Sequence, residues 1–325
     1  MLEHGYSARA LPVWQRLRAS LDWRFCPDAL YISRQYRNRN GIYPDLENPR
    51  DLSEKTQWLK LHDRSPLHTI CADKIRAREY VAARADPAYL VPLRHVFHDA
   101  SAILPERIPE ARFALKTNHD QGGVFLCKDR ATFDWEKVRN DVARRLRTPK
   151  YPGFREWQYK GVRPGVLVED FLEGDGGGEV CELKFYCFNG RPGFVQVVRD
   201  RFDRHREAFY SPDWERMGFQ GPVPLIEGEV SRPACLDRLL RDAARLATPF
   251  VFVRIDFLYS GGDTAHFGEV TFHFGAGLIR FTPLEYDRRF GDMIDLSCLP
   301  ETRRMQREIA RDIDARRRAR NGAPV

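Results

Sequence analysis

Two short segments late in the chain carry polar or charged residues at every second position. Residues 253–258 (Val-Arg-Ile-Asp-Phe-Leu) and 268–273 (Gly-Glu-Val-Thr-Phe-His) are rich in β-branched and aromatic residues, and the turn sequence Ser-Gly-Gly-Asp at 260–263 lies between them, which predicts two strands. Because strand side chains alternate between faces, pairing of these strands would bring together a guanidinium, two carboxylates and a hydroxyl. These groups belong to Arg254, Asp256, Glu269 and Thr271. Two carboxylates that share a divalent cation with phosphate oxygens commonly form a Mg²⁺-nucleotide site, and a hairpin with a charged solvent face is the alternative.

A lysine that ends an apolar strand and precedes a glycine-containing loop is the second such pattern. Lys116 follows Phe-Ala-Leu at 113–115, and the loop 118–123 reads Asn-His-Asp-Gln-Gly-Gly. Glycines let the backbone approach a ligand closely, and successive amides can bind phosphate oxygens. The segment lacks the Gly-Lys-Ser/Thr ending of a P-loop, and an ordinary hairpin turn is the alternative interpretation.

Acids and a further lysine follow in the middle of the chain. The apolar segment 165–172 contains two adjacent acids and leads into the glycine-rich stretch 174–178. One face of the next predicted strand, 181–188, carries Glu182, Lys184 and Tyr186. Lys184 is either a buried phosphate contact or half of an ion pair at the solvent. The Asn-Gly pair at 189–190 predicts a tight hairpin after this strand.

These residues need a framework of helices and strands, and the spacing of apolar residues predicts one. Residues 1–40 contain four apolar residues at helix-like spacing, namely Leu11, Trp14, Leu17 and Leu21. Ser53 is predicted as the N-cap of a helix that buries Trp58, Leu59 and Leu61. Further predicted elements are helices at 73–85, 133–147 and 233–247 and strands at 90–97 and 112–117.

Composition excludes several classes of protein. No run of about 18 apolar residues exists, which excludes a transmembrane helix, and the polar first residues lack the apolar core of a secretory signal. Seven cysteines without a C-x-x-C pair argue against a zinc site or a disulfide framework. We therefore expect reduced thiols and a cytoplasmic protein. The 53 basic and 46 acidic residues give a net charge of +7, which favours anionic partners.

Much of the positive charge lies in the arginine-rich residues 303–320. Ile309 and Ile313 recur there at helical spacing. We expect a solvated helix that packs on the body through this thin apolar stripe, and a polyanion-binding tail is the alternative.

Several motifs occur in an informative order. They are Asn-Pro at 48–49, Glu-Lys at 54–55, Gln-Trp-Leu-Lys-Leu at 57–61, Ala-Asp-Lys at 72–74, Leu-Lys-Thr-Asn-His at 115–119, Lys-Phe-Tyr-Cys-Phe-Asn-Gly at 184–190 and Phe-Gly-Glu-Val-Thr-Phe at 267–272. Together they resemble the TupA-like branch of the ATP-grasp superfamily, which is tied to teichuronopeptide and other polysaccharide biosynthesis. The resemblance covers residues 28–295, and it is carried by the ordered set of motifs.

The resemblance implies a nucleotide site. Lys74, in the first turn of the predicted helix 73–85, and Lys116 would hold the phosphates, with Lys184 as a further contact. A mobile loop would close over the triphosphate, and its residues include His119, Gln121, Gly122 and Gly123. A hinge strand would meet adenine through Glu169, Asp170, Phe171 and Leu172. The acid that binds ribose stays open among Glu173, Asp175, Glu179 and Glu182.

The same resemblance implies the reacting end of the site. Asp256 and Glu269 would be the magnesium carboxylates, and Thr271 stands where many relatives have an asparagine ligand. A hydroxyl is a weaker ligand than that amide oxygen. Arg254 would steady the reacting phosphoryl and acyl oxygens. The implied catalytic residues are Arg254, Lys116 and His119.

The implied fold is α+β, the ATP-grasp fold, in which two α+β subdomains grip ATP beside a helical N-terminal region. The implied ranges are 1–110 for the N-terminal region, 111–170 for the lid subdomain, 171–300 for the catalytic subdomain and 301–325 for a basic C-terminal helix or tail.

The implied activity is that of an ATP-dependent carboxylate–amine ligase that forms an amide through an acylphosphate, with ATP and Mg²⁺ as cofactors. Its substrates would be an amino acid and a uronic acid of a surface polysaccharide or its precursor. The alternatives are an ATP-grasp kinase that phosphorylates a hydroxyl and a non-catalytic protein that binds acidic polysaccharide. A glycosyltransferase fits the ATP motifs less well. We expect no nucleic acid partner, and peripheral membrane association and the oligomeric state stay open.

Overall fold

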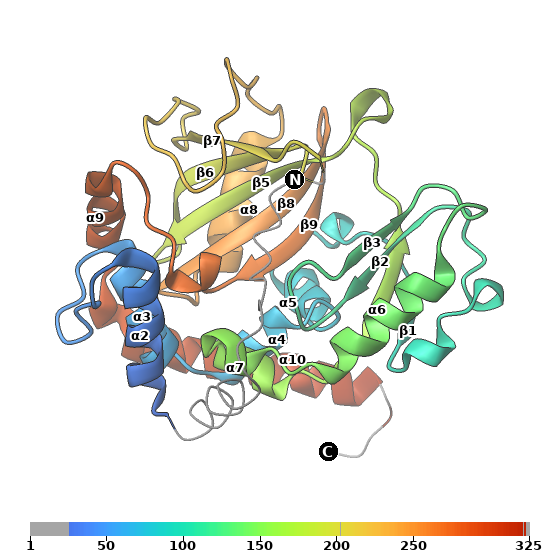
Figure 1. The fold of residues 1–325 in the computed structure, drawn as a ribbon, viewed down its shortest axis with the longest axis horizontal. Coiled ribbons are helices and arrows are strands. Elements are labelled where there is room, and N and C mark those ends of the chain that lie inside the picture. Colours follow the sequence, from blue (N-terminus) through green and yellow to red (C-terminus); the bar gives the residue numbers. More distant parts are fainter. Residues whose placement is uncertain (1–25, 202, 321, 323–325) are drawn as a thin grey trace, which may run out of the picture.

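Two antiparallel β-sheets position the residues named above (Figure 1). The computed structural model describes residues 26–201, 203–320 and 322. The first sheet has the strand order β1-β4-β2-β3, and the second has the order β7-β6-β5-β8-β9. The strands are β1 (Leu93–Phe97), β2 (Phe113–Thr117), β3 (Val124–Cys127), β4 (Val166–Asp170), β5 (Cys181–Phe188), β6 (Arg191–Arg199), β7 (Arg206–Tyr210), β8 (Phe252–Gly261) and β9 (Thr264–Thr271). The predicted α+β class is confirmed.

Helices surround both sheets in Figure 1. They are α2 (Asp28–Asn40), α3 (Leu52–His62), α4 (Pro66–Ala72), α5 (Ala77–Arg84), α6 (Trp135–Arg147), α7 (Tyr151–Phe154), α8 (Leu236–Ala247), α9 (Leu284–Asp292) and α10 (Leu299–Arg320). The predicted apolar spacing at Leu11, Trp14, Leu17 and Leu21 lies outside the described residues. Strand β1 belongs to the first sheet although it falls within the range predicted as the helical N-terminal region.

The second sheet buries one of its faces against α8. Leu183, Phe185 and Cys187 alternate along β5, and they pack in one hydrophobic cluster with Leu236 and Leu239 of α8. Burial of each large apolar side chain contributes about 1.5–3 kcal/mol, so this contact fixes which face of the sheet is the core face. The intervening residues of β5 therefore point away from the helix.

Helix α6 covers the first sheet in the same way. Val138 and Val142 of α6 lie in a cluster with Phe113 and Leu115 of β2. Lys116 lies between the inward positions of β2 and therefore emerges on the opposite face. The two sheets thus each have one apolar face under a helix and one face that carries functional groups.

The hairpin predicted at Asn189 and Gly190 is present between β5 and β6. Their φ angles are 46° and 79°, which is the left-handed region that tight two-residue turns require. A bulge between Tyr186 and Cys187 shifts the pairing farther along the hairpin. As a result Lys184 pairs with Gln196.

The arginine-rich C-terminal helix packs as the sequence predicts. Ala310 and Ile313 of α10 are buried, and Ile309 packs beside them in the cluster that contains α8. The side-chain amide of the buried Gln306 donates a hydrogen bond of 2.8 Å to the carbonyl of Pro249. The helix is therefore anchored by a narrow stripe while its arginines face outward.

The predicted start and buried face of α3 need correction. Asp51, not Ser53, is the N-cap, because its side chain and that of Glu54 form a reciprocal capping box. Of the three side chains predicted as buried, Leu59 is buried, whereas Trp58 and Leu61 are only half-buried. The polar residues Gln57 and Lys60 are buried instead, and their side chains donate to carbonyls of residues 276–277, which follow β9.

The predicted position of Lys74 in a first helical turn is also wrong. Helix α5 begins at Ala77, and Lys74 lies in the turn between α4 and α5. The Asp73 carboxylate fixes this turn, since it accepts bonds from the Ile75 amide at 2.9 Å and the Asn118 side chain at 2.7 Å.

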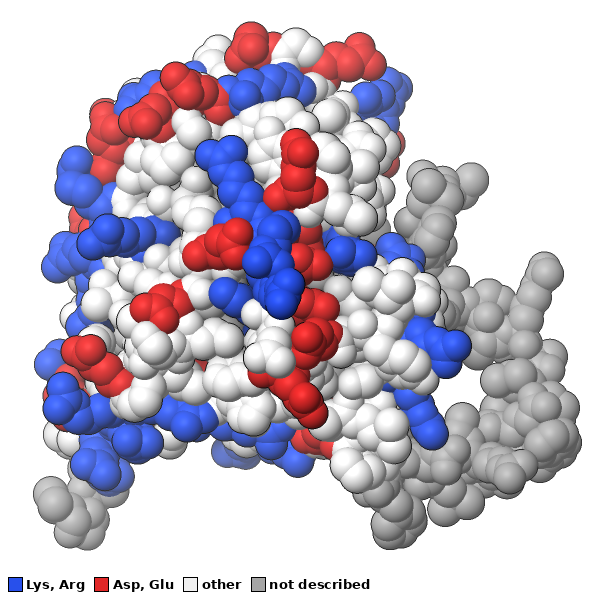
Figure 2. Space-filling model, turned by 90° about the vertical axis from the view of Figure 1, so that its left-hand side faces the viewer, with Lys and Arg blue, Asp and Glu red and all other residues white. Residues whose placement is uncertain are grey.

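Charged side chains, helix hydropathy and cysteines can each be compared with what the sequence predicts. On the face shown in Figure 2, basic and acidic side chains lie interspersed. No helix in the described part of the chain is long and apolar enough to cross a membrane. All seven cysteines are free thiols, as the sequence predicts.

The β5–β6 turn generates a prediction about stability. Replacement Gly190→Ala should lower the free energy of unfolding by about 1–2 kcal/mol, because an L-residue resists the left-handed conformation. An added Cβ would also lie 3.1 Å from the Cα of Thr248. Urea unfolding measures the change. Gly153→Ala, at a glycine with a normal φ and open space around it, is the control, and equal stability of both variants would contradict the prediction.

Candidate active site

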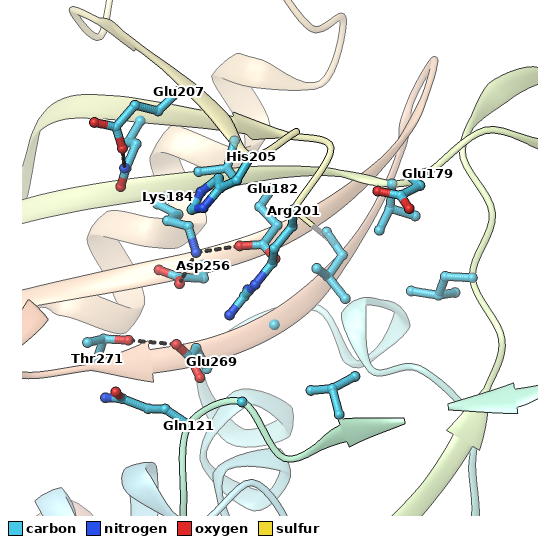
Figure 3. Close-up of a pocket in the computed structure, with 18 of the residues that line it drawn as sticks. Gln121, Glu179, Glu182, Lys184, Arg201, His205, Glu207, Asp256, Glu269 and Thr271 are labelled. Carbon is cyan, nitrogen blue, oxygen red and sulfur yellow. Dashed lines mark hydrogen bonds and ion pairs between the residues drawn. The ribbon is translucent and has the colours of Figure 1, made fainter. Parts of the chain in front are cut away.

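A cavity of about 430 Å³ lies between the functional faces of the two sheets. Lys116 and Gln121 line it from the first sheet, and Lys184, Asp256 and Glu269 line it from the second. Figure 3 shows Lys184, Asp256 and Glu269 entering this space from three strands and Gln121 entering it from a loop. This volume is in the range of pockets that hold small ligands.

The strand register explains the order of groups on the cavity floor. In one row across the second sheet, Gln196 of β6 pairs with Lys184 of β5, which pairs with Asp256 of β8, which pairs with Glu269 of β9. The neighbouring row contains Tyr186, Arg254 and Thr271. Antiparallel pairing thus places the two predicted metal carboxylates directly opposite each other, as expected for the hairpin.

Arg254 connects the acids of β8 and β9. Its Nε and Nη2 atoms donate to the two oxygens of Asp256, both at 2.7 Å, and Nη2 lies 3.4 Å from Glu269 Oε1. The Thr271 hydroxyl accepts from the same nitrogen at 3.1 Å and donates to Glu269 at 3.0 Å. Burial raises the pKa of Glu269, but the nearby Lys74 and Arg254 charges outweigh it and lower this pKa to about 2. Glu269 is therefore ionised at neutral pH.

The two lysines predicted to hold phosphates meet at the cavity. The Lys74 ammonium donates to the Asp120 carbonyl at 2.7 Å and lies 3.9 Å from Glu269. Lys116 Nζ lies 2.7 Å from Glu169 Oε2, and the guanidinium of Arg78 contacts the other oxygen of that carboxylate at 2.7 Å. Burial lowers the pKa of Lys74. Both lysines line the cavity.

A second charged cluster lies near the start of β5. The buried Glu182 carboxylate contacts both Lys184 and Arg201, and Lys184 lies 3.2 Å from Asp256 Oδ2. Burial raises the pKa of Glu182, while the ammonium and the guanidinium lower it to about 2. Lys184 is thus a buried group rather than half of a solvent-exposed pair.

Most of the predicted site residues line this cavity. They are Lys74, Lys116, Gln121, Gly122, Asp170, Phe171, Leu172, Glu182, Lys184, Arg254, Asp256, Glu269 and Thr271. Of the other acids considered for ribose, Glu173 and Glu179 also line it. Their roles stay predictions, but the structure brings them into one space.

Three predicted site residues do not line the cavity. His119 is buried, with Nε2 at 3.1 Å from the Arg145 carbonyl, so it is placed for a structural contact. A Cβ at Gly123 would lie 1.7 Å from the Thr117 hydroxyl oxygen, and close packing accounts for this glycine. Glu169 lies behind Lys116 and holds its ammonium. The catalytic contact expected for His119 is therefore not supported by its position.

Several cavity residues were missed by the sequence analysis. They are Gln196, Arg201, His205 and Glu207, which come from β6, β7 and the connection between them. The dense charge of residues 199–206 was an available signal for Arg201 and His205. Gln196 and Glu207 gave no such signal, because their place depends on how distant strands pair.

The donor set is compatible with magnesium bound together with a nucleotide. No group of three or more His, Cys, Asp or Glu residues suited to a metal occurs among the residues that the structure describes. Asp256 and Glu269 nevertheless give two opposed carboxylates on the cavity wall. Mg²⁺ is commonly held by one or two carboxylates with substrate phosphates and water, so these residues fit such an ion better than a closed protein site.

Comparison with known proteins gives one family match. The family model described as TupA-like ATP-grasp matches residues 54–295. No curated protein matches the sequence.

Matches among solved structures include two ligases and a synthetase. D-alanine–D-alanine ligase from Bacillus anthracis is 13% identical over 80% of this chain and 72% of its own, with a TM-score of 0.41. For the D-cycloserine synthetase DcsG the identity is 15% over 84% and 95%, with a TM-score of 0.40. An L-amino acid ligase from Bacillus licheniformis is 14% identical over 82% of this chain and 58% of its own, with a TM-score of 0.40.

The Glu182 cluster generates a prediction about pH. The pKa of the Glu182 carboxyl is lowered from 4.5 to about 2 in the folded protein. Ionised Glu182 therefore stabilises the fold above about pH 4.5, and this contribution is lost as the pH falls toward 2. Glu182→Gln should therefore destabilise the protein most near neutral pH, and the difference from wild type should shrink on acidification. Urea unfolding at a series of pH values measures it, and a difference that is constant with pH would contradict the assignment.

Proposed function

Because the chain belongs to the TupA-like ATP-grasp family, we propose that it is an ATP-dependent ligase that joins a carboxylate to an amine through an acylphosphate. The observation that carries this proposal is the convergence of Lys74, Lys116 and Arg254 with the carboxylates of Asp256 and Glu269 on one cavity. Separate basic residues from three parts of the chain suit a polyphosphate, whose negative charge they share.

The nucleotide would lie across the cavity from the hinge to the reacting end. Phe171 and Leu172 follow β4 on the cavity wall and would contact the adenine ring. Glu182, at the start of β5 on the cavity wall, is proposed as the acid that would accept from ribose hydroxyls. Lys74 and Lys116 would bind phosphate oxygens, with Lys184 and Arg201 as further contacts.

The reaction would take place in two steps, phosphoryl transfer and then amide formation. An oxygen of the substrate carboxylate attacks the γ-phosphorus of ATP, the bond to the bridging oxygen breaks, and ADP leaves. The amine nitrogen then attacks the carbonyl carbon of the acylphosphate, the carbon–oxygen bond breaks, and phosphate leaves as the nitrogen loses a proton. Arg254 would stabilise negative charge on the transferring phosphoryl group and on the acyl oxygen. His119 is not assigned a step.

A magnesium ion held by Asp256 and Glu269 would offset charge on the β- and γ-phosphates. In the structure those carboxylates pair with Arg254, Lys184 and Lys74. Thr271 would orient Glu269, to which its hydroxyl donates.

The substrates proposed are an amino acid and a uronic acid of a surface polysaccharide or its precursor. Support comes from the family branch and from the basic groups of the cavity, which favour an acidic substrate. Use of ATP favours the cytoplasm as the site of action.

Loss of the metal carboxylates tests the nucleotide site. Asp256→Asn and Glu269→Gln should each lower ADP release at least a hundredfold, because charge stabilisation of the transferring group is lost. A coupled assay for ADP measures this loss, and the midpoint of thermal unfolding shows that each variant is folded. Asp213→Asn, at an exposed acid away from the cavity, is the control. Full activity of either site variant would exclude the proposed metal site.

Dependence on two substrates separates a ligase from a kinase. We expect rapid ADP release only when an amino acid and a uronic acid such as glucuronate are both present, because the acylphosphate needs the acid and turnover needs the amine. ADP and phosphate are measured over a grid of acids and amines. Equal release of ADP with a hydroxyl compound alone, without phosphate, would identify a kinase, and release of AMP would exclude the acylphosphate route.

A further inference from the structure

Glu207 is a buried acid on the cavity wall that lacks a cationic partner. It lies on β7 and is 2% exposed. No described lysine or arginine forms an ion pair with it. The other two buried acids of the wall, Glu182 and Asp256, each pair with lysine or arginine, and so does the half-buried Glu269. Glu207 is therefore the one buried acid on this wall that forms no ion pair with a described lysine or arginine.

Neutral groups hold the Glu207 carboxylate in a fixed orientation. The Gln196 amide donates to Oε2 at 2.6 Å, and the Gly221 backbone amide donates to Oε1 at 3.1 Å. The Tyr186 hydroxyl in turn donates to the Gln196 side-chain oxygen at 3.0 Å, which fixes the amide. Burial raises the pKa of Glu207 to about 7, so the ionised form is costly until a cation or further donor reaches it.

The position of Glu207 separates it from the reacting groups. Strands β7 and β8 are three strand spacings apart in the sheet, which is on the order of 14 Å. In Figure 3, Glu207 lies on the far side of Lys184 from Glu269 and Gln121. Glu207 is therefore placed to contact a remote part of a substrate rather than the bond that forms.

The wall beside this acid is largely apolar. Pro222 and Val223 follow Gly221, whose amide bonds Glu207, and Ile279, Phe281 and the Tyr186 ring also line the cavity. An apolar wall that ends in a carboxylate suits an alkyl chain that ends in a cation. A neutral sugar would leave the charge unpaired and would place hydroxyls against surfaces without partners.

We propose that Glu207 and Gln196 form a specificity site for a cationic group on an alkyl stem, so that the amine substrate is a basic amino acid or a diamine. The substrate assignment rests on the proposed ligase function, whereas the cation site stands on the geometry of the wall. Glu207 acts in this proposal as a residue that selects the substrate, and it takes no part in bond formation.

Lysine and norleucine test the site, because they share an alkyl stem and differ in the terminal ammonium. With Mg-ATP and glucuronate, wild type should show at least a tenfold higher kcat/KM for lysine. Glu207→Gln, which keeps the size and removes the charge, should lower that ratio at least tenfold, since hydrogen bonds to charged groups are the stronger ones. Glu215→Gln, at an exposed acid after β7, should keep the ratio. A wild-type ratio near one, or an unchanged ratio in Glu207→Gln, overturns the proposal.

Calorimetric titration separates failure of this site from failure of the ligase assignment. Lysine and norleucine are titrated into the protein loaded with Mg-ADP, with wild type and Glu207→Gln side by side. Lysine-selective binding that Glu207→Gln abolishes supports the site even if no acid and amine pair releases ADP. Ligation of neutral amines with no lysine preference overturns the site and leaves the ligase standing. If Glu207→Gln weakens the binding of glucuronate and leaves lysine binding unchanged, Glu207 belongs to a sugar site, and the proposed cation site is overturned.

Discussion

Mutual neutralisation of buried and half-buried charges on three adjacent strands is the constraint on which the cavity depends. Lys184 of β5 lies opposite Asp256 of β8, and Arg254 bridges Asp256 to Glu269 of β9. A single buried charge without a partner costs several kcal/mol, so these groups are tolerated only as a set. The set also prepares the cavity for ligand. Phosphate oxygens and a metal ion can replace partners in ion pairs that already exist. The side chains of these pairs have already lost much of their hydration during folding.

The part of this arrangement that is local in the chain could be predicted. Alternation along 253–258 and 268–273 with one short turn between them leaves few ways to pair the strands, and Asp256 indeed lies opposite Glu269. The Asn-Gly turn at 189–190 similarly defines the β5–β6 hairpin, because both positions need positive φ. The ordered motifs then assigned the family, which the match to residues 54–295 confirms.

The missed features depend on irregularities or on contacts distant in sequence. Strict pairing from the turn would place Val195 opposite Lys184, but the bulge after Tyr186 brings Gln196 there and so aims an amide at Glu207. A period-two pattern contains no sign of such a bulge. Glu169 shows the second difficulty. Its place in a motif suggests a nucleotide contact, whereas β2 and β4 pair so that it holds Lys116 from behind. Sequence spacing finds residues that share a strand face, but not which charge each of them neutralises.

The polar face of α3 shows how an element outside both sheets still shapes the cavity. Gln57 donates to the carbonyls of Ala276 and Gly277, and Lys60 donates to Ala276 at 2.7 Å. The backbone they hold follows β9, and it has positive φ at three successive residues, 275–277. Such a segment keeps its shape only where neighbouring groups fix it, and here buried side chains of α3 do so. Since Phe274 and Gly275 line the cavity, the motif at 57–61 serves the site through the backbone it positions. These hydrogen bonds also explain why α3 buries the amide of Gln57 and the ammonium of Lys60, whereas its apolar pattern predicts burial of Trp58 and Leu61.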